Sequence, residues 1–410
     1  MLRCPIFVVP LALLVGCYST PRSPSTEPEV VKIDIPVEDV KELTRGNNEF
    51  ALDLYKKIAE TEKGNIIVSP ASIRTALAMT YAGARGKTAS EMKDVLHFTL
   101  PDDKLHAAMG GMTDSMQTAG KNRPYQLNIA NALWAQQEMK LQPGFLDITN
   151  KHYAAGVREV DFKGKTEEAR GTINKWVEEK TQEKIKELLK QGDIDDMTRL
   201  VLTNAVYFQG KWKQQFDAKK TRPGDFELEP GKKVQVPMMS QEMKVRSAHT
   251  SKFTLLELPY QGDRWRMVFL LPEKRHGLKD VEAKLTEKEL SATLTKLQAD
   301  ESPVVLPKFE FKLATKLKPE LITLGMPTAF GNGADFSSMT EQPELRTGNV
   351  IHQAMIEVDE EGTVAAAATG VTFQLTSEKA VFQLDHPFLF ILRDNATDTI
   401  LFIGRVSDPR

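Results

Sequence analysis

The decisive stretch of this sequence is residues 357–370, which read EVDEEGTVAAAATG. Residues 350–358 alternate apolar and mostly polar side chains, as in a strand with one buried face. Glu360-Glu361-Gly362 ends that strand, and small residues with almost no charge follow it. Read at period two, one face of the following segment carries only small uncharged side chains, those of Thr363, Ala365, Ala367 and Thr369. This pattern predicts a segment that can enter a crowded sheet, where a charged side chain would be costly to bury.

A short helix or a surface loop is the alternative for the alanines, because alanine is the best helix former. However, Thr, Val and Gly flank the alanines, and no stripe of large apolar residues would give such a helix a face to bury. The pattern therefore favours the strand.

Composition and charge exclude several classes of protein. The chain has 410 residues, of which 41% are hydrophobic and 27% charged, as in an ordinary globular protein. Its net charge of -2 provides no basic surface field, so we expect no nucleic-acid partner. The two cysteines, Cys4 and Cys17, both lie in the first twenty residues. The body is therefore expected to contain no disulfide, thiolate metal site or thiol nucleophile.

The first residues are typical of a targeting segment. Arg3 precedes an apolar run that is too short to span a bilayer and ends in LVGC at Cys17. This pattern predicts a lipoprotein signal peptide over residues 1–16 and lipid attachment at Cys17; an ordinary signal peptide is the alternative. Either form exports the chain, to the cell envelope or the extracellular space, with contact to membrane through the lipid only. Residues 17–42, rich in Ser, Thr and Pro at their start, are interpreted as a tether, and residues 43–410 as the folded domain.

Helical patterns dominate the first part of the body and strand patterns the second, which predicts an α+β fold. The serines Ser69 and Ser72 are placed to cap a helix that begins near residue 70. Helical spacing is seen in residues 47–58, 73–81, 88–96, 173–189 and 313–324. Strand-like runs are seen in residues 127–134, 200–208, 254–259, 265–271, 375–384, 388–393 and 400–406.

Signatures of an enzyme are weak. The sequence has no G-x-S-x-G elbow and no H-E-x-x-H helix. The GKT triplet at 86–88 resembles the end of a phosphate loop, but Tyr81 stands where the first glycine should be. The seven histidines are scattered, without metal-ligand spacing. We therefore expect no catalytic residue, metal or cofactor.

The segment from Glu357 to the four alanines resembles the hinge of the serpin family, and further motifs match that family in order over about residues 45–410. These motifs are NIIVSPASI at 65–73, INKWV at 173–177, LTNAVYFQGKW at 202–212, LPKF at 306–309, LGM at 324–326, ADFS at 334–337, DHPFLF at 385–390 and GRV at 404–406.

The resemblance implies a single α+β domain, with helices packed on a large mixed sheet, smaller sheets, and an exposed reactive loop over residues 360–380. It also implies a suicide inhibitor of serine proteases. The protease would cleave the loop, and the hinge would then insert into the sheet as a new strand while the covalent acyl-enzyme persists. A non-inhibitory serpin-like binding or structural protein is the alternative.

Family spacing also implies the bond that is cleaved. The residue 14 positions after Gly362 is Thr376, and Ser377 follows it; Ser377 also lies 11 positions before Phe388. Thr376 would suit an elastase-like or subtilisin-like protease. If the loop is one residue shorter, Leu375 is the cleaved residue and a chymotrypsin-like target is expected.

The remaining site residues follow from the resemblance alone. Ser69, Ser72, Asn204 and His352 resemble a polar cluster beneath the sheet opening, and Trp212 resembles the aromatic residue at the insertion point; ordinary buried polar residues and a core tryptophan are the alternatives. Gln353 and Val364 depart from the family pattern. Residues 102–117 are not basic, so we expect no glycosaminoglycan cofactor, and we expect a monomer. The hinge comprises Glu360, Glu361, Gly362, Thr363, Val364, Ala365, Ala366, Ala367, Ala368 and Thr369.

Overall fold

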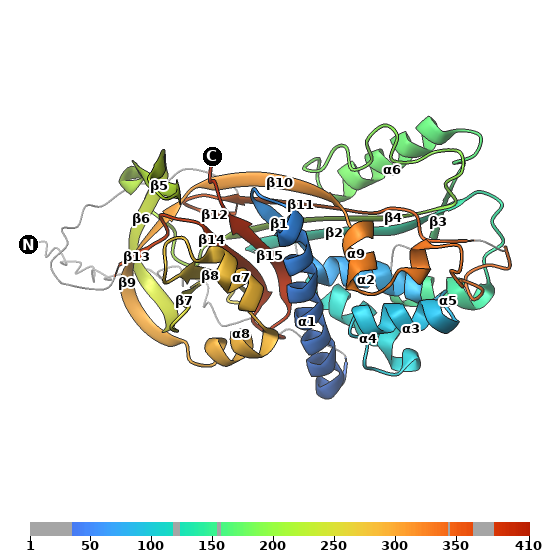
Figure 1. The fold of residues 1–410 in the computed structure, drawn as a ribbon, viewed down its shortest axis with the longest axis horizontal. Coiled ribbons are helices and arrows are strands. Elements are labelled where there is room, and N and C mark those ends of the chain that lie inside the picture. Colours follow the sequence, from blue (N-terminus) through green and yellow to red (C-terminus); the bar gives the residue numbers. More distant parts are fainter. Residues whose placement is uncertain (1–34, 118–123, 154–156, 343–344, 364–380) are drawn as a thin grey trace, which may run out of the picture.

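The computed structural model describes residues 35–117, 124–153, 157–342, 345–363 and 381–410 (Figure 1). These residues form a single α+β domain built on two sheets, as the sequence predicted. None of the helices in these ranges is long and apolar enough to cross a membrane.

A six-stranded sheet runs along the length of the molecule (Figure 1). Its strands lie in the order β10-β11-β4-β2-β3, and the two-residue β12 pairs with the end of β4. The central pair, β4 and β11, is parallel, whereas β4 pairs antiparallel with β2. The strands are β2 (Tyr125–Gln136), β3 (Val157–Val160), β4 (Leu200–Lys211), β10 (Phe309–Lys316), β11 (Val350–Val358) and β12 (Gly362–Thr363).

Both faces of the sheet are buried at its central strand β4, which explains why β4 is apolar on both sides. Helix α2 (Pro70–Tyr81) lies under one face, and α6 (Thr166–Lys180) covers the other (Figure 1). Alternate β4 residues belong to different cores: Leu202 and Val206 join the large core, and Val201 and Ala205 join the core beneath α6. Side chains on the α2 face are therefore enclosed between helix and sheet.

A nine-stranded sheet packs beside the first (Figure 1). Its order is β1-β15-β14-β8-β7-β6-β9-β13, and β5 pairs with β6 off this path. The strands are β1 (Ile66–Val68), β5 (Arg222–Glu229), β6 (Lys232–His249), β7 (Phe253–Pro259), β8 (Trp265–Pro272), β9 (Gln298–Pro307), β13 (Phe382–Gln383), β14 (Phe388–Asp394) and β15 (Ile400–Val406).

The other helices surround the large core. They are α1 (Val37–Thr61), α3 (Gly86–Val95), α4 (Asp102–Gln117), α5 (Pro143–His152), α7 (Leu278–Lys284), α8 (Glu287–Leu294) and α9 (Lys318–Leu324), with short 3-10 turns η1 (Ala218–Lys220) and η2 (Thr328–Phe330). Helix α1 begins at Val37, so it includes the last residues of the segment interpreted as a tether.

Two helix predictions were partly wrong. Residues 313–316 continue strand β10, because their backbones pair with β11 as far as Lys316; only Lys318–Leu324 is helical. The helix expected over 173–189 ends at Lys180. Gln182 and Glu183 follow with positive φ angles of 52° and 61°, which a right-handed helix cannot contain.

Candidate functional site

The candidate site is the seam between the parallel strands β4 and β11. They pair from Val350 with Leu202 to Met355 with Tyr207. Beyond that point the two strands no longer pair with each other, and Gly362–Thr363 lies beside β4 instead. The seam is therefore closed along most of its length and already parted at one end.

The parted end is occupied by the chain that turns back from β11. Gly362 pairs with Lys211 and Thr363 with Gly210, both antiparallel to β4. The turn is held by Asp359, whose Oδ1 accepts hydrogen bonds from the backbone N–H groups of Glu361 (3.0 Å) and Gly362 (3.1 Å). Gly362 and Thr363, two residues of the predicted hinge, thus form a short strand beside β4.

Trp212 fastens this turn from the β4 side. Its backbone N–H donates to the Glu361 carbonyl at 2.7 Å, and its indole Nε1–H donates to the Asp359 carbonyl at 3.0 Å. The indole is buried and stacks on Tyr260 with ring centroids 4.5 Å apart. Trp212 therefore lies against Asp359 and Glu361, at the start of the predicted hinge.

Charged groups hold the outer side of the turn. Lys308 Nζ lies 2.7 Å from Glu360 Oε2, and the Thr221 hydroxyl donates to Glu360 Oε1 at 2.7 Å. Burial alone would raise the pKa of Glu360, but the bonds from Lys308 and Thr221 outweigh it and hold that pKa below its usual value. Glu360 is thus ionised and anchored in this state.

Glu361 is held less well than its neighbour. The residue is 8% exposed, and neither carboxylate oxygen accepts a hydrogen bond within the described part of the chain. Lys211 Nζ lies 3.4 Å from Oε2 and is itself half exposed. Among the described residues, Glu361 is therefore held by this ion pair, without the hydrogen bonds that fix Glu360.

Any side chain at position 362 would force the backbone to move. Its φ is +151°, and a Cβ added there would lie 2.1 Å from the Gly210 carbonyl oxygen. The absence of a side chain lets β12 lie directly against β4. The Glu-Glu-Gly signal in the sequence is therefore a turn whose glycine is required by close approach.

A row of polar side chains crosses the closed part of the seam. His352, Asn204 and Asn131 are neighbours in register on β11, β4 and β2, and all three are buried. His352 Nδ1 is hydrogen-bonded to Asn204 Oδ1, and Asn204 Nδ2 donates to Asn131 Oδ1 and to Ser72 Oγ. We call His352, Asn204, Asn131 and Ser72 the polar row. Parting β4 from β11 would require the hydrogen bond between His352 and Asn204 to break.

His352 also reaches the helix beneath the sheet. Its Nε2 accepts from the backbone N–H of Ser69 at 3.1 Å, so the hydrogen on the ring lies at Nδ1. Complete burial lowers the pKa of His352 to about 3, because the charged form would lose its hydration. The imidazole is therefore neutral and bridges α2 to β4.

Neither serine caps α2 with its side chain. The Ser69 residue stands at the N-cap position without a side-chain capping bond, and its hydroxyl has no partner in the described structure. The Ser72 hydroxyl donates instead to Asn131 Oδ1 at 3.0 Å. The capping prediction was wrong because the sheet, and not the helix end, binds Ser72.

The structure brings Ser72, Asn204 and His352 into one network, places Ser69 beside it, and puts Trp212 at the hinge. Asn131, Asp359, Lys308 and Thr221 were not predicted. Gln353 is buried, and its Oε1 has no partner among the described residues. The predictions for Val364, Ala365, Ala366, Ala367, Ala368, Thr369, Leu375, Thr376, Ser377 and Cys17 fall outside the described residues, as do the signal peptide and most of the tether.

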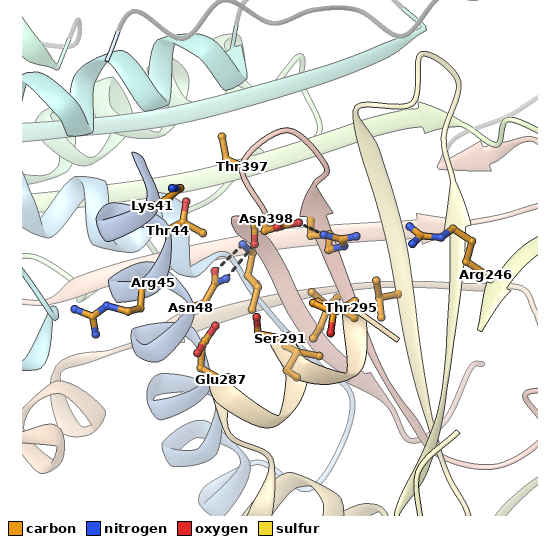
Figure 2. A pocket seen from close by; sticks show the side chains of 16 residues that line it. Lys41, Thr44, Arg45, Asn48, Arg246, Glu287, Ser291, Thr295, Thr397 and Asp398 are labelled. Atoms are coloured by element: carbon orange, nitrogen blue, oxygen red, sulfur yellow. Dashed lines mark hydrogen bonds and ion pairs between the residues drawn. The ribbon is translucent and has the colours of Figure 1, made fainter. Parts of the chain in front are cut away.

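A hollow of about 290 Å³ lies apart from the seam, and Figure 2 shows the side chains that line it. Lys41, Thr44, Arg45 and Asn48 come from α1, and Glu287 and Ser291 come from α8. Many of its polar groups bond one another; for example, Asn48 Nδ2 donates to the Asp398 carbonyl at 3.0 Å.

A family model described as "Serpin (serine protease inhibitor)" matches residues 45–409. The leukocyte elastase inhibitor of Sus scrofa is 39% identical over 90% of this chain and 100% of its own length. A serpin-like protein of Thermococcus kodakarensis, described as uncharacterized, is 39% identical over 96% of this chain and 90% of its own length.

Among solved structures, Serpin48 of the insect Tenebrio molitor matches with a TM-score of 0.80 and 34% identity, over 90% of this chain and 98% of that one. Human thyroxine-binding globulin in complex with thyroxine matches with a TM-score of 0.83 and 30% identity, over 90% of this chain and 99% of that one.

Proposed function

Since the chain belongs to the serpin family, we propose that it is a suicide-substrate inhibitor of serine proteases whose cleaved loop inserts between β4 and β11. Serpins are generally protease inhibitors and not catalytic enzymes. The observation that carries the proposal is the parted seam, where Gly362–Thr363 already pairs with β4 in the antiparallel sense that an inserting strand requires.

The covalent step is ordinary acyl transfer. The serine hydroxyl of the protease attacks the carbonyl carbon of Thr376 and loses its proton to the protease's own base. The bond to Ser377 breaks, its nitrogen leaves as a protonated amine, and Thr376 remains esterified to the protease. Residues 364–376 then continue the strand that β12 begins and carry the esterified protease along the sheet.

The energetics of insertion are balanced finely. Each backbone hydrogen bond gained is worth about 1 kcal/mol net, and fixing each residue costs about 1–2 kcal/mol. These terms nearly cancel, so the burial of the small side chains decides the sign. The uncleaved state is therefore metastable in this proposal.

The target that we propose is a protease with a small or medium pocket, elastase-like or subtilisin-like. Thr376 supports this choice, and so do the relatives described as leukocyte elastase inhibitors. Leu375 as the cleaved residue would point to a chymotrypsin-like protease instead. We further propose that the inhibitor acts as a monomer, exported and tethered through a lipid on Cys17.

The function is tested by incubating the protein with pancreatic elastase, subtilisin, chymotrypsin and trypsin. We expect a denaturation-resistant complex and a released C-terminal peptide whose first residue is Ser377. If every protease cleaves the loop and none is trapped, the inhibitory proposal is wrong for these enzymes.

The hinge is tested by Thr363→Arg. Loop cleavage should continue, but the complex should be lost, because an arginine on the inserting strand would meet a packed sheet. Thr172→Arg, on the exposed face of α6, is the matched control and should trap protease normally. Equal trapping by both variants would contradict the assignment of the hinge.

A further inference from the structure

Strands β6 and β7 separate next to Trp212. They pair only over Arg246–His249 and Thr254–Glu257. Before Arg246, β6 stays paired with β9 on its other side, and the side chain of Gln214 bonds its backbone, accepting from Lys244 N–H at 3.2 Å and donating to the Glu242 carbonyl at 2.9 Å. The sheet therefore opens into a gap, which we call the wedge.

The wedge is a cavity of about 540 Å³ with an apolar floor. Trp212, Met243, Val245 and Leu258 line it, and each is no more than 3% exposed. Sites for small molecules typically have about 300–1,000 Å³ and walls that are mostly apolar. The hollow of about 290 Å³ shown in Figure 2 is smaller.

The rim of the wedge carries an excess of positive charge. Lys213, Lys244, Arg246 and Arg266 line it, together with the single carboxylate of Asp263. Asp263 lies 2.5 Å from Lys213 Nζ and 3.7 Å from Arg266. Glu257, outside the cavity, lies 3.0 Å from Arg246 and 3.4 Å from Arg266. Lys213, Arg246 and Arg266 thus share two carboxylates, and Lys244 adds a fourth positive charge at the rim, which favours an anion.

Arg266 supplies a specific donor. Its side chain is 15% exposed, and its Nε is buried without a hydrogen-bond partner in the described residues. A buried donor without an acceptor is unfavourable, and a planar anion is the acceptor that a guanidinium binds best. An anionic group at the rim would lie against the guanidinium of Arg266, which lines the wedge, while an attached apolar body covered Trp212.

We propose that the wedge binds a small amphipathic anion, an aromatic or branched apolar body that carries one carboxylate or sulfonate. The anionic group lies at Arg266 and Lys244, and the apolar body lies on Met243, Leu258 and Trp212. This site is separate from the protease-binding loop, and its occupancy does not depend on the inhibitory function.

The probe for the test is 8-anilinonaphthalene-1-sulfonate, whose fluorescence rises when it leaves water, titrated into the full chain. Ala299 lines the wedge and Ser291 lines the hollow of Figure 2, and both are exposed small residues. Ala299→Trp should fill the wedge and weaken binding about tenfold or more, whereas Ser291→Trp should change the affinity less than about twofold. Unchanged binding in Ala299→Trp, or an equal loss in Ser291→Trp, would overturn the proposal.

A second pair of variants tests the charge and does not depend on packing. Lys244→Glu should weaken binding about tenfold at low salt, and less at high salt, because it reverses a charge at the rim. Lys279→Glu makes the same change in net charge on α7, away from the wedge, and should leave the affinity unaltered. Equal affinities in the two variants would show that the anion binds elsewhere and would overturn the proposal.

Discussion

The two ends of the β4–β11 seam are held by opposite means. At the hinge, the strands are parted and the turn is fastened by hydrogen bonds from Trp212 and by the ion pair of Glu360. At the polar row, the strands are paired and a neutral, fully buried His352 joins β11 to β4 and α2. In the proposed mechanism, the inserting strand extends from the hinge end, and the polar row is the barrier that it must cross.

In the proposed mechanism, this difference would account for the metastability of the uncleaved state. Opening the polar row would expose the donor and acceptor groups of buried residues, at about 1–3 kcal/mol for each group left without a partner. The hinge is held by separate contacts, the ion pairs of Glu360 with Lys308 and of Glu361 with Lys211, which lie outside the paired part of the seam.

The largest effect is expected from Gly362→Ala. The added Cβ would lie 2.1 Å from the Gly210 carbonyl oxygen, so the turn must leave β4. We expect the uncleaved protein to lose about 3 kcal/mol or more of stability, measured by urea unfolding. Gly231→Ala is the control, since φ there is +75° but a Cβ would meet nothing within 4 Å. If the two variants lose the same amount of stability, the positive φ angle alone accounts for the need for glycine at 362, and the close approach to β4 does not.

The polar row should make stability depend on pH. The pKa of His352 is about 3 in the folded protein and near 6.5 when unfolded, so the unfolded chain binds the extra proton in between. Stability is therefore fully present above pH 6.5 and falls, by up to about 1.4 kcal/mol per pH unit, as the pH drops toward 3.

His352→Gln isolates this contribution from the carboxylates that titrate in the same range. The variant should be less stable at pH 7 and should show a shallower decline in urea midpoint between pH 6 and 4. An identical slope in the two proteins would mean that His352 is not buried neutral.

Asn131→Ala tests the member of the polar row that the sequence did not reveal. Removing the amide leaves Asn204 Nδ2 and the Ser72 hydroxyl each short of one acceptor, at a cost of about 1–3 kcal/mol. Asn128→Ala, on the same strand but with an exposed bond to the Lys180 carbonyl, should cost less. Equal losses of thermal stability would remove Asn131 from the network.

The smallest effect is expected from Lys308→Ala. Its ion pair with Glu360 measures 2.7 Å, but the Lys308 side chain is 39% exposed, so solvent screening limits the loss to about 1 kcal/mol or less. Because the pKa of Glu360 is lowered in the folded protein, its ionised carboxylate stabilises the fold at neutral pH. This contribution is lost as the pH falls through that pKa. The loss of stability should also shrink in high salt, whereas Lys312→Ala, on the strand β10 that follows Lys308, should show neither effect.

Much of the site could be predicted because its signals are local. Gly362 and the glutamates before it form a turn within four residues, and the alternation in β11 is visible without any contact. Asn131 could not be found in this way, because an asparagine within an apolar strand looks the same whether it faces solvent or a partner. Its contact with Asn204 joins residues 73 positions apart.

The sequence by itself determined which residues could enter a sheet: small, uncharged side chains after an obligatory glycine, a property that depends only on side-chain size and charge. The tertiary structure decided which groups hold the hinge and the seam. Lys308 meets Glu360, and Ser69 meets His352, across 52 and 283 residues of chain. Such contacts are set by strand register and by the packing of α2 against the sheet, and both depend on the whole core.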